Sequence, residues 1–252
     1  MIPFEDWSGW LRPGETLDEL RPGRLRIIQK RDGYRFSMDP VLLCAFARIG
    51  AGDAVCDLGT GSGVIPLLLA HRTAAASIIG VEVQPELADR ARRTVELNRL
   101  QARVTILEKD LRLIREALPA ESCQTVLANP PYRPPASGRV SPSAERALAR
   151  HEVHGGLADF IRGAAWLLPT GGRFFVVYLA ERLAELLGTM RQVGLEPKRL
   201  RCIHSRTGDE ARMVLVEGRK GSGPGLKVEA PLYLYRGEDY TEEVLAMYGE
   251  GV

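Results

Sequence analysis

The sequence contains only four cysteines among 252 residues, and no two of them form a Cys-x-x-Cys pair. Three of the four lie within apolar runs, where a thiol behaves as a small hydrophobic side chain. Neither a zinc site nor a disulfide framework is expected from this spacing. We therefore expect no bound metal and a reducing, cytoplasmic location.

The sequence also lacks a long hydrophobic run. The longest apolar stretch, 64–70, is far too short to span a bilayer. Residues 1–6 are acidic and have no apolar core of the kind that a signal peptide needs. The formal net charge is only +2, so attraction to nucleic acid would have to come from local basic clusters. We expect no membrane partner, and the oligomeric state stays open.

What is present is an alternation of apolar strand and helix patterns, which predicts an α/β fold with a mostly parallel sheet covered on both faces. The expected strands are 55–58, 77–83, 104–107, 125–128, 174–179, 199–204 and 212–217, and the expected helices are 41–49, 64–70, 85–100, 111–118, 157–168 and 182–193. The last two strands are joined by a short loop, which predicts an antiparallel strand at one edge. We expect an N-terminal arm over 1–33 with one short hairpin, a single α/β domain over 34–218, and an extension over 219–252 packed on the same domain.

A glycine-rich loop, Asp57-Leu58-Gly59-Thr60-Gly61-Ser62-Gly63, directly follows the first strand of this pattern. Glycines there let the backbone pass close beneath a ligand because no Cβ intervenes. The dinucleotide fingerprint would need a further glycine at Val64 or Pro66. Asp57 precedes the first glycine, where it would repel a pyrophosphate and attract a cation. Taken alone, the loop could also be an ordinary tight turn.

Two further acids follow the next two strands. Glu82 ends the second strand, at the place where an acid typically binds both hydroxyls of a ribose. Asp110 follows the third strand, where it could hold an adenine amino group. Together with the loop, these acids predict an adenosyl ligand that carries a positive charge.

The fourth strand runs into Asn129-Pro130-Pro131-Tyr132. An exocyclic amino nitrogen is planar and a poor nucleophile, because its lone pair is delocalised into the ring. Accepting hydrogen bonds from both of its N–H groups would draw it toward a tetrahedral shape. Asn129 offers a side-chain carbonyl and Pro130 a backbone carbonyl that two prolines hold in place. Tyr132 offers a flat face for a base. These four residues are the predicted catalytic residues.

The loop and Glu82 resemble the cofactor site of class I S-adenosylmethionine-dependent methyltransferases, and the resemblance covers roughly 35–218. It implies a Rossmann-like, mostly parallel seven-stranded sheet with an antiparallel edge strand. It also implies S-adenosylmethionine as cofactor and S-adenosylhomocysteine as product. The implied cofactor-binding residues are Phe36, Asp39, Asp57, Gly59, Thr60, Gly61, Gly63, Glu82, Val83, Asp110, Leu111 and Asn129.

The tetrapeptide is similar to that of methyltransferases that act on adenine N6, guanine N2 or glutamine N5. Glutamine N5 enzymes carry a larger N-terminal helical domain, whereas roughly 50 residues precede the first strand here. DNA adenine enzymes carry a target-recognition domain that is not visible. Guanine N2 enzymes of ribosomal RNA more often have phenylalanine in the place of Tyr132. An inactive RNA-binding module is a further alternative, which the intact tetrapeptide and acids disfavour.

The small bacterial enzymes that methylate N6 of adenine 37 in valine tRNA are the family that this sequence resembles most. The segments that carry this resemblance are Phe36–Leu43 and Glu145–His151, although the Gly-Thr-Asp-Gly form typical of the first is absent. The resemblance implies an RNA substrate, most specifically tRNA. Basic side chains around the catalytic loop would contact its phosphates. The predicted RNA-binding residues are Arg133, Arg139, Arg146, Arg150 and His151.

Overall fold

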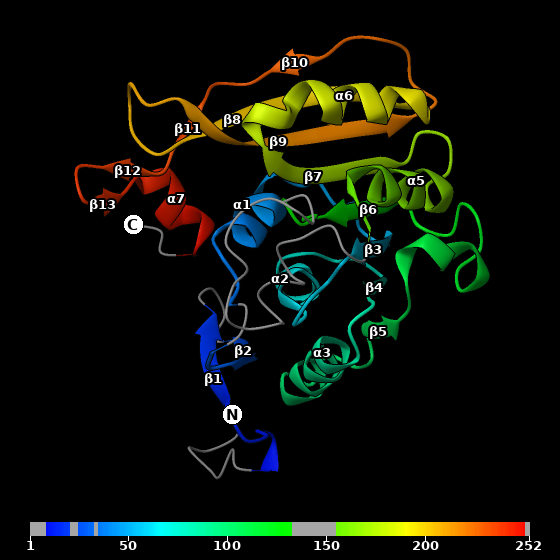
Figure 1. The fold of residues 1–252 in the computed structure, drawn as a ribbon, viewed down its shortest axis with the longest axis vertical. Coiled ribbons are helices and arrows are strands. Elements are labelled where there is room, and N and C mark those ends of the chain that lie inside the picture. Colours follow the sequence, from blue (N-terminus) through cyan, green and yellow to red (C-terminus); the bar gives the residue numbers. More distant parts are fainter. Residues whose placement is uncertain (1–8, 21–24, 33–34, 133–154, 250–252) are drawn as a thin grey trace.

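The computed structural model describes residues 9–20, 25–32, 35–132 and 155–249. Its centre is a nine-stranded sheet with helices on both faces (Figure 1). The main helices are α1 (Asp39–Phe46), α2 (Val64–Arg72), α3 (Pro85–Leu97), α5 (Leu157–Leu167) and α6 (Leu183–Gln192). One core cluster packs α1, α2 and α3 on one face of the sheet, and a second packs α5 and α6 on the other. This three-layer arrangement confirms the predicted fold class.

The sheet is wound outward from its middle in both directions. Its long strands are β3 (Ala54–Leu58), β4 (Ser77–Glu82), β5 (Val104–Glu108), β6 (Thr125–Ala128), β7 (Arg173–Leu179), β8 (Leu195–His204) and β9 (Ala211–Lys220). The order across the sheet is β10-β8-β9-β7-β6-β3-β4-β5, in which β10 is the short strand Lys227–Val228. The chain therefore leaves β3 toward β4 and β5, then returns to β6 on the other side of β3. Ligands of open α/β sheets bind where the strand order reverses in this way, and here that point lies between β3 and β6.

The antiparallel strand differs in place from the sequence prediction. β9 is antiparallel to both β7 and β8, and it lies between them instead of at the edge. The crossover through α6 takes the chain past one strand position before β8 begins, and the hairpin from β8 then fills that position in the opposite direction. Two short strands, β10 (Lys227–Val228) and β11 (Leu232–Tyr233), cover the outer edge of β8 in parallel.

The expected helix 111–118 is instead a shorter 3₁₀ helix, Leu111–Glu116, with non-helical dihedral angles at Leu113. The Asp110 side chain accepts a hydrogen bond from the backbone N–H of Arg112 at 2.9 Å, which caps the start of this segment. A six-residue 3₁₀ turn keeps the chain close to the end of β5. It therefore holds the residues around Asp110 beside the sheet edge.

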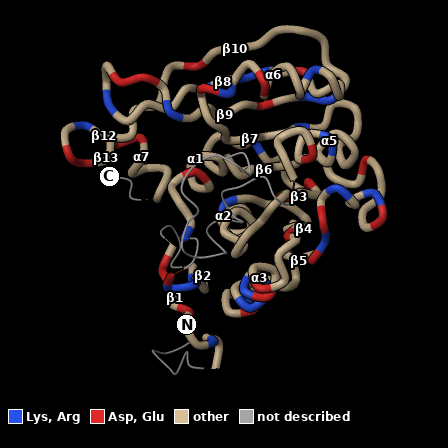
Figure 2. Tube along the Cα trace, in the orientation of Figure 1, with Lys and Arg blue, Asp and Glu red and all other residues tan. Residues whose placement is uncertain are grey.

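Charged residues of both signs alternate along the outer helices and the C-terminal segments, whereas the elements around β3, β6 and α2 carry few charges (Figure 2). Among the described residues, no helix is long and apolar enough to cross a bilayer. The four cysteines are all free thiols, and Cys202 is the only one of them that is not buried.

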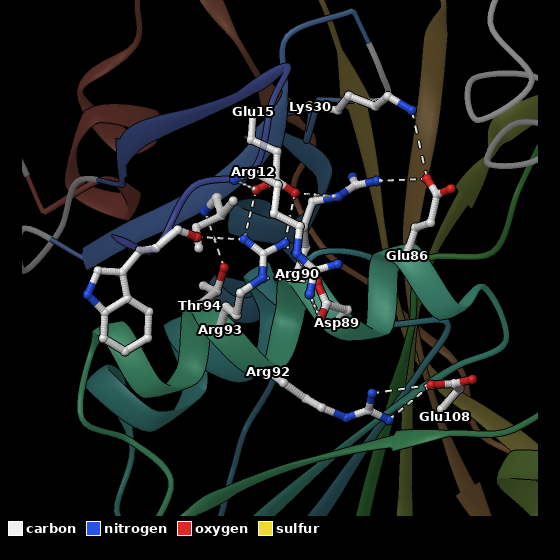
Figure 3. A network of polar contacts seen from close by, with 12 residues as sticks. Arg12, Glu15, Lys30, Glu86, Asp89, Arg90, Arg92, Arg93, Thr94 and Glu108 are labelled. Carbon is white, nitrogen blue, oxygen red and sulfur yellow. Dashed lines mark hydrogen bonds and ion pairs between the residues drawn. The ribbon is translucent and has the colours of Figure 1, made fainter. Parts of the chain in front are cut away.

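The N-terminal arm contains the expected hairpin. Strands β1 (Glu15–Leu20) and β2 (Leu25–Lys30) pair in antiparallel register. Figure 3 shows the ion pairs that attach this hairpin to α3. Glu15 pairs with Arg93 at 2.7 Å and with Arg90 at 3.5 Å. Because Glu15 and Arg90 are nearly excluded from solvent, the hairpin is packed on the domain.

The C-terminal segment, to which the sequence assigned no function, follows the free edge of the sheet back toward α1 (Figure 1). After β11 it forms a small hairpin of β12 (Tyr235–Arg236) and β13 (Asp239–Tyr240), then helix α7 (Glu242–Met247). Val244 of α7 is fully buried in the core cluster that contains α1. The Arg72 guanidinium at the end of α2 donates to the Met247 carbonyl. The extension therefore packs against α1, the helix that begins at Asp39.

Candidate active site

A cavity lies at the carboxyl ends of β3, β4 and β6, at the point where the strand order reverses. The predicted residues that line it are Phe36, Gly59, Thr60, Gly61, Glu82, Val83, Leu111, Asn129 and Pro131. The predicted residues that do not line it are Asp39, Asp57, Gly63, Asp110, Pro130 and Tyr132. The sequence missed several other lining residues, among them Gln84, Lys109 and Phe160. Their positions depend on packing and carry no local motif.

The glycine loop is folded tightly over the end of β4. The backbone N–H groups of Gly59 and Thr60 both donate to the Val81 carbonyl at 2.9 Å. Gly59 has a φ of +73°, and a Cβ there would meet the Phe160 ring at 2.9 Å. Gly61 has a φ of +57°, with open space where a side chain would stand. The glycines therefore serve both the left-handed backbone and the close approach to the cavity.

Glu82 is fixed at the cavity wall by the backbone around it. One carboxylate oxygen accepts from the Gly61 N–H at 2.8 Å, and the other accepts from the Gln84 N–H at 2.9 Å. The side chain is 5% exposed. A carboxylate held in this way presents acceptor lone pairs in a fixed direction, which suits recognition of a ribose diol.

Asp57 lies behind the loop and is completely buried. Neither carboxylate oxygen has a hydrogen-bond partner among the described residues. Burial raises the pKa of Asp57 to about 8; the nearby Thr60 hydroxyl lowers it, and the charge of Glu82 raises it further. A cation in the adjacent cavity would favour the ionised form of this carboxyl. The predicted contribution of Asp57 to a cationic ligand would therefore act through the electric field.

We expect Asp57→Asn to change how the free energy of unfolding depends on pH. Because the pKa of Asp57 is raised on folding, its protonated form favours the folded state at low pH. Stability should fall as the pH rises from about 4 to about 8, by at most about 1.4 kcal/mol per pH unit. The variant should lose that slope in urea titrations made without added cofactor. Glu108→Gln, an exposed site on β5, is the control, and equal slopes for wild type and Asp57→Asn would refute the assignment.

The far wall of the cavity is apolar where a planar base would lie. Val83 and Leu111 both line it. Asp110 does not, since its carboxylate pairs with the Arg112 guanidinium at 2.5 Å. The role of Asp110 toward an adenine amino group stays a prediction, which would require that pair to rearrange.

The tetrapeptide that the sequence predicts to be catalytic, Asn129–Tyr132, begins directly after β6. Asn129 and Pro131 line the cavity, and Pro130 is buried. The ring of Tyr132 instead packs edge-on against Tyr178 of β7, with centroids 5.9 Å apart. Its hydroxyl lies 2.5 Å from Asn129 Oδ1 and 3.0 Å from Asp39 Oδ2. The Tyr132 side chain therefore contacts residues of three elements: Asp39 of α1, Asn129 directly after β6, and Tyr178 of β7.

All five predicted RNA-binding residues, Arg133, Arg139, Arg146, Arg150 and His151, lie outside the described residues. One described arginine, Arg182, lies close to the tetrapeptide and was missed in the sequence. It stands over the Tyr178 ring at 5.1 Å from the centroid and donates to the Tyr132 carbonyl at 3.5 Å. It also pairs with Glu185, so it is not simply an exposed cation.

The lining residues fit the cofactor that the sequence predicts. Glu82 would hold the ribose hydroxyls, and Val83 and Leu111 would contact the adenine faces. The buried, unpartnered carboxylate of Asp57 is a place where a cationic sulfonium or amino group nearby would relieve a free-energy penalty. Among the residues that the structure describes, His, Cys, Asp and Glu form no cluster able to hold a metal ion.

A family of known proteins matches the part of the chain that contains both the glycine loop and the tetrapeptide Asn129–Tyr132. The family model Methyltransferase small domain matches residues 40–194. A tRNA1(Val) (adenine(37)-N6)-methyltransferase from Bacteroides fragilis is 26% identical over 178 residues, or 71% of this chain and 74% of that protein. One from Trichodesmium erythraeum is 26% identical over 234 residues, or 89% and 95%. The crystal structure of a predicted O-methyltransferase from Agrobacterium tumefaciens has a TM-score of 0.68 at 26% identity, and the match covers 85% of this chain and 97% of that one.

Proposed function

This chain belongs to the methyltransferase small domain family, and we propose that it methylates N6 of an unpaired adenine in RNA, most specifically adenine 37 of a valine tRNA. It is an S-adenosylmethionine-dependent methyltransferase, and the finer assignment is ours. One observation carries that assignment: Asn129, followed by two prolines, stands at the cavity wall beside the glycine loop.

The chemistry follows from what this wall can accept. S-adenosylmethionine supplies a methyl group on a positively charged sulfur. The side-chain carbonyl of Asn129 and the backbone carbonyl of Pro130 accept the two hydrogens of an amino group. Accepting both hydrogens draws the nitrogen lone pair out of the ring and toward the methyl group. Acceptors that the fold orients before the reaction stabilise the transition state without reorganisation.

An amino group fits this wall better than a hydroxyl. Methylation of an alcohol or phenol requires that the oxygen lose its proton to a base. In the described part of the chain, the titratable residues that line the cavity are Glu82 and Lys109. Both Glu82 oxygens accept backbone N–H bonds, and Lys109 Nζ is paired with the Glu116 carboxylate at 2.7 Å. The aromatic amine needs no base during attack, because it can lose its proton afterwards.

The choice of adenine 37 is supported by the relatives. The Bacteroides and Trichodesmium proteins are named for that position in tRNA1(Val). An adenine beside an anticodon is already unpaired, so turning it out of the loop costs little free energy. Methylating it therefore requires no domain that opens a duplex.

We expect label from S-adenosylmethionine in total tRNA when tRNA, ribosomal RNA, duplex DNA and a release factor are offered in parallel. Nucleoside digestion of the tRNA should yield N6-methyladenosine, and mapping should place it next to the anticodon. Labelling should fall as salt rises, because ions compete for the phosphates. N2-methylguanosine in ribosomal RNA, or label in protein, would refute the adenine assignment. Binding of RNA without any transfer would favour an inactive RNA-binding module.

A further inference from the structure

We infer that Asp39 and the hydroxyl of Tyr132 are positioning groups that fix the orientation of the Asn129 side-chain amide. Their effect is to present the amide oxygen to the amino group that is methylated. This inference rests on the proposed function, since it deepens the role of the same site. The sequence assigned Tyr132 only a stacking ring and placed Asp39 at the cofactor.

The three side chains form a continuous line of polar contacts. The Tyr132 oxygen lies 2.5 Å from Asn129 Oδ1 and 3.0 Å from Asp39 Oδ2. The Ser37 hydroxyl donates to the same Asp39 oxygen at 2.7 Å. Asp39 is the first residue of α1, whereas Asn129 follows β6. The tertiary fold alone brings them together.

The number of hydrogens available limits how these contacts are made. A tyrosine hydroxyl has one hydrogen, whereas a carboxylate and an amide carbonyl are both acceptors. The hydrogen gains more from the carboxylate, because a charge-assisted bond is the stronger one. An amide oxygen would then face the Tyr132 oxygen with no hydrogen between them, and the two would repel each other.

Rotating the Asn129 amide by 180° satisfies every contact. The two ends of a carboxamide are nearly equal in size, so its nitrogen can occupy the place next to Tyr132. The amide N–H then donates to Tyr132, and the Tyr132 O–H donates to Asp39. The amide oxygen is then turned away from Tyr132, and because Asn129 lines the cavity, this oxygen is the one assigned to the amino group there. We assign this orientation to the catalytic form.

Packed elements hold both positioning groups of this relay, which runs from Asp39 through Tyr132 to Asn129. Asp39 is followed by Pro40 in the first turn of α1, a helix whose apolar side chains are buried. The Tyr132 ring packs against Tyr178, which is fully buried in β7. Side chains locked by packing keep a catalytic group in its productive geometry. The relay would therefore orient Asn129 before any substrate arrives.

The amide orientation can be measured without a substrate, because the chain has only two asparagines, Asn98 and Asn129. Labelling with ¹⁵N-asparagine gives two side-chain amides, which Asn129→Asp assigns. Asn98 is an internal control, since its amide donates to the carbonyls of Arg26 and Thr94. We expect nuclear Overhauser contacts from the Asn129 amide hydrogens to the Tyr132 ring, and a shift of the Asn129 signals alone in Tyr132→Phe. Absence of those contacts would overturn the inference.

Kinetics supply the second arm, measured on whichever substrate the wild type labels, so that a wrong assignment of the base would not obscure the result. We expect Tyr132→Phe and Asp39→Ala each to lower kcat about 10-fold, less than loss of the acceptor itself. KM for the substrate and affinity for S-adenosylmethionine should stay within about twofold. Asp39→Asn should recover most of kcat, because its carbonyl can still accept from Tyr132.

The double variant Tyr132→Phe/Asp39→Ala separates a relay from two independent roles. If Asp39 acts on Asn129 only through Tyr132, removing either group already removes the effect of both. The double variant should then lose no more kcat than either single variant. Multiplied losses would overturn the relay. Weaker binding of S-adenosylmethionine by both Asp39 variants, with kcat unchanged, would return Asp39 to the cofactor site and also overturn it. Melting temperatures near that of the wild type are the control for folding.

Discussion

Replacing Asn129 by alanine is expected to lower the rate of methyl transfer by about a hundredfold or more and to leave affinity for S-adenosylmethionine nearly unchanged. Asn129 lines the cavity at the end of β6. Glu82, the acidic residue of the described cavity lining, already accepts hydrogen bonds from the Gly61 and Gln84 backbone N–H groups and cannot take over this role. Without its carbonyl, one hydrogen of the amino group loses its acceptor. The nitrogen lone pair then stays delocalised in the ring.

Single-turnover kinetics at saturating cofactor and substrate would measure this effect, and calorimetry would measure cofactor binding. Asn129→Asp is the matched control, because it keeps an acceptor oxygen at nearly the same place and should retain more activity than alanine. Full activity in Asn129→Ala would refute the acceptor role. An equal loss of cofactor affinity would instead make Asn129 a binding residue.

The strands of the sheet could be predicted from the sequence because a parallel strand buried on both faces is a short apolar run bounded by turn residues. β6, Thr125–Ala128, has the predicted boundaries. β8 begins four residues earlier than predicted, at Leu195. Pro197 and polar residues occupy that first part, and the pairing with β9 shifts register between Pro197 and Arg199. A proline at a bulge removes the signal on which the prediction depends.

The position of the glycine loop and of Glu82 at the cavity could be predicted, because the loop follows β3, Glu82 is the last residue of β4, and the carboxyl ends of parallel strands share one edge of the sheet. The contact between Asp39 and Tyr132 could not, since the two residues are 93 positions apart. No local pattern in the sequence indicates that α1 packs beside β7. The same holds for Phe160, which meets the loop only because α5 covers β3.

The C-terminal extension carries no readable pattern for a different physical reason. Its four strands have two residues each, which is too short for an alternation of apolar and polar side chains to show. They are stabilised by backbone pairing to β8 or to each other, and by tertiary contacts such as Arg72 with the Met247 carbonyl. Strands this short depend on partners, such as the edge strand β8, that the rest of the fold must first provide.

Replacing Glu82 by alanine is the second change with a large expected effect, a loss of roughly 30-fold to 100-fold in affinity for S-adenosylmethionine. Two consequences add. The ribose hydroxyls lose their acceptor, and the N–H groups of Gly61 and Gln84 lose the oxygens that hold the loop in shape. Glu82→Gln keeps the size and one carbonyl oxygen, so its loss should be smaller.

Glu108→Ala is the matched control for Glu82→Ala, because the two glutamates are register partners on adjacent strands β4 and β5. Glu108 is exposed and pairs with Arg92, and it does not line the cavity. Calorimetry with S-adenosylmethionine should therefore show wild-type affinity for Glu108→Ala. Equal losses in the two variants would mean that general disturbance of the strand ends, and not ribose recognition, weakens binding. NADH binding in place of S-adenosylmethionine would contradict the assigned cofactor, because the acid that precedes the first glycine, Asp57, disfavours a pyrophosphate at this loop.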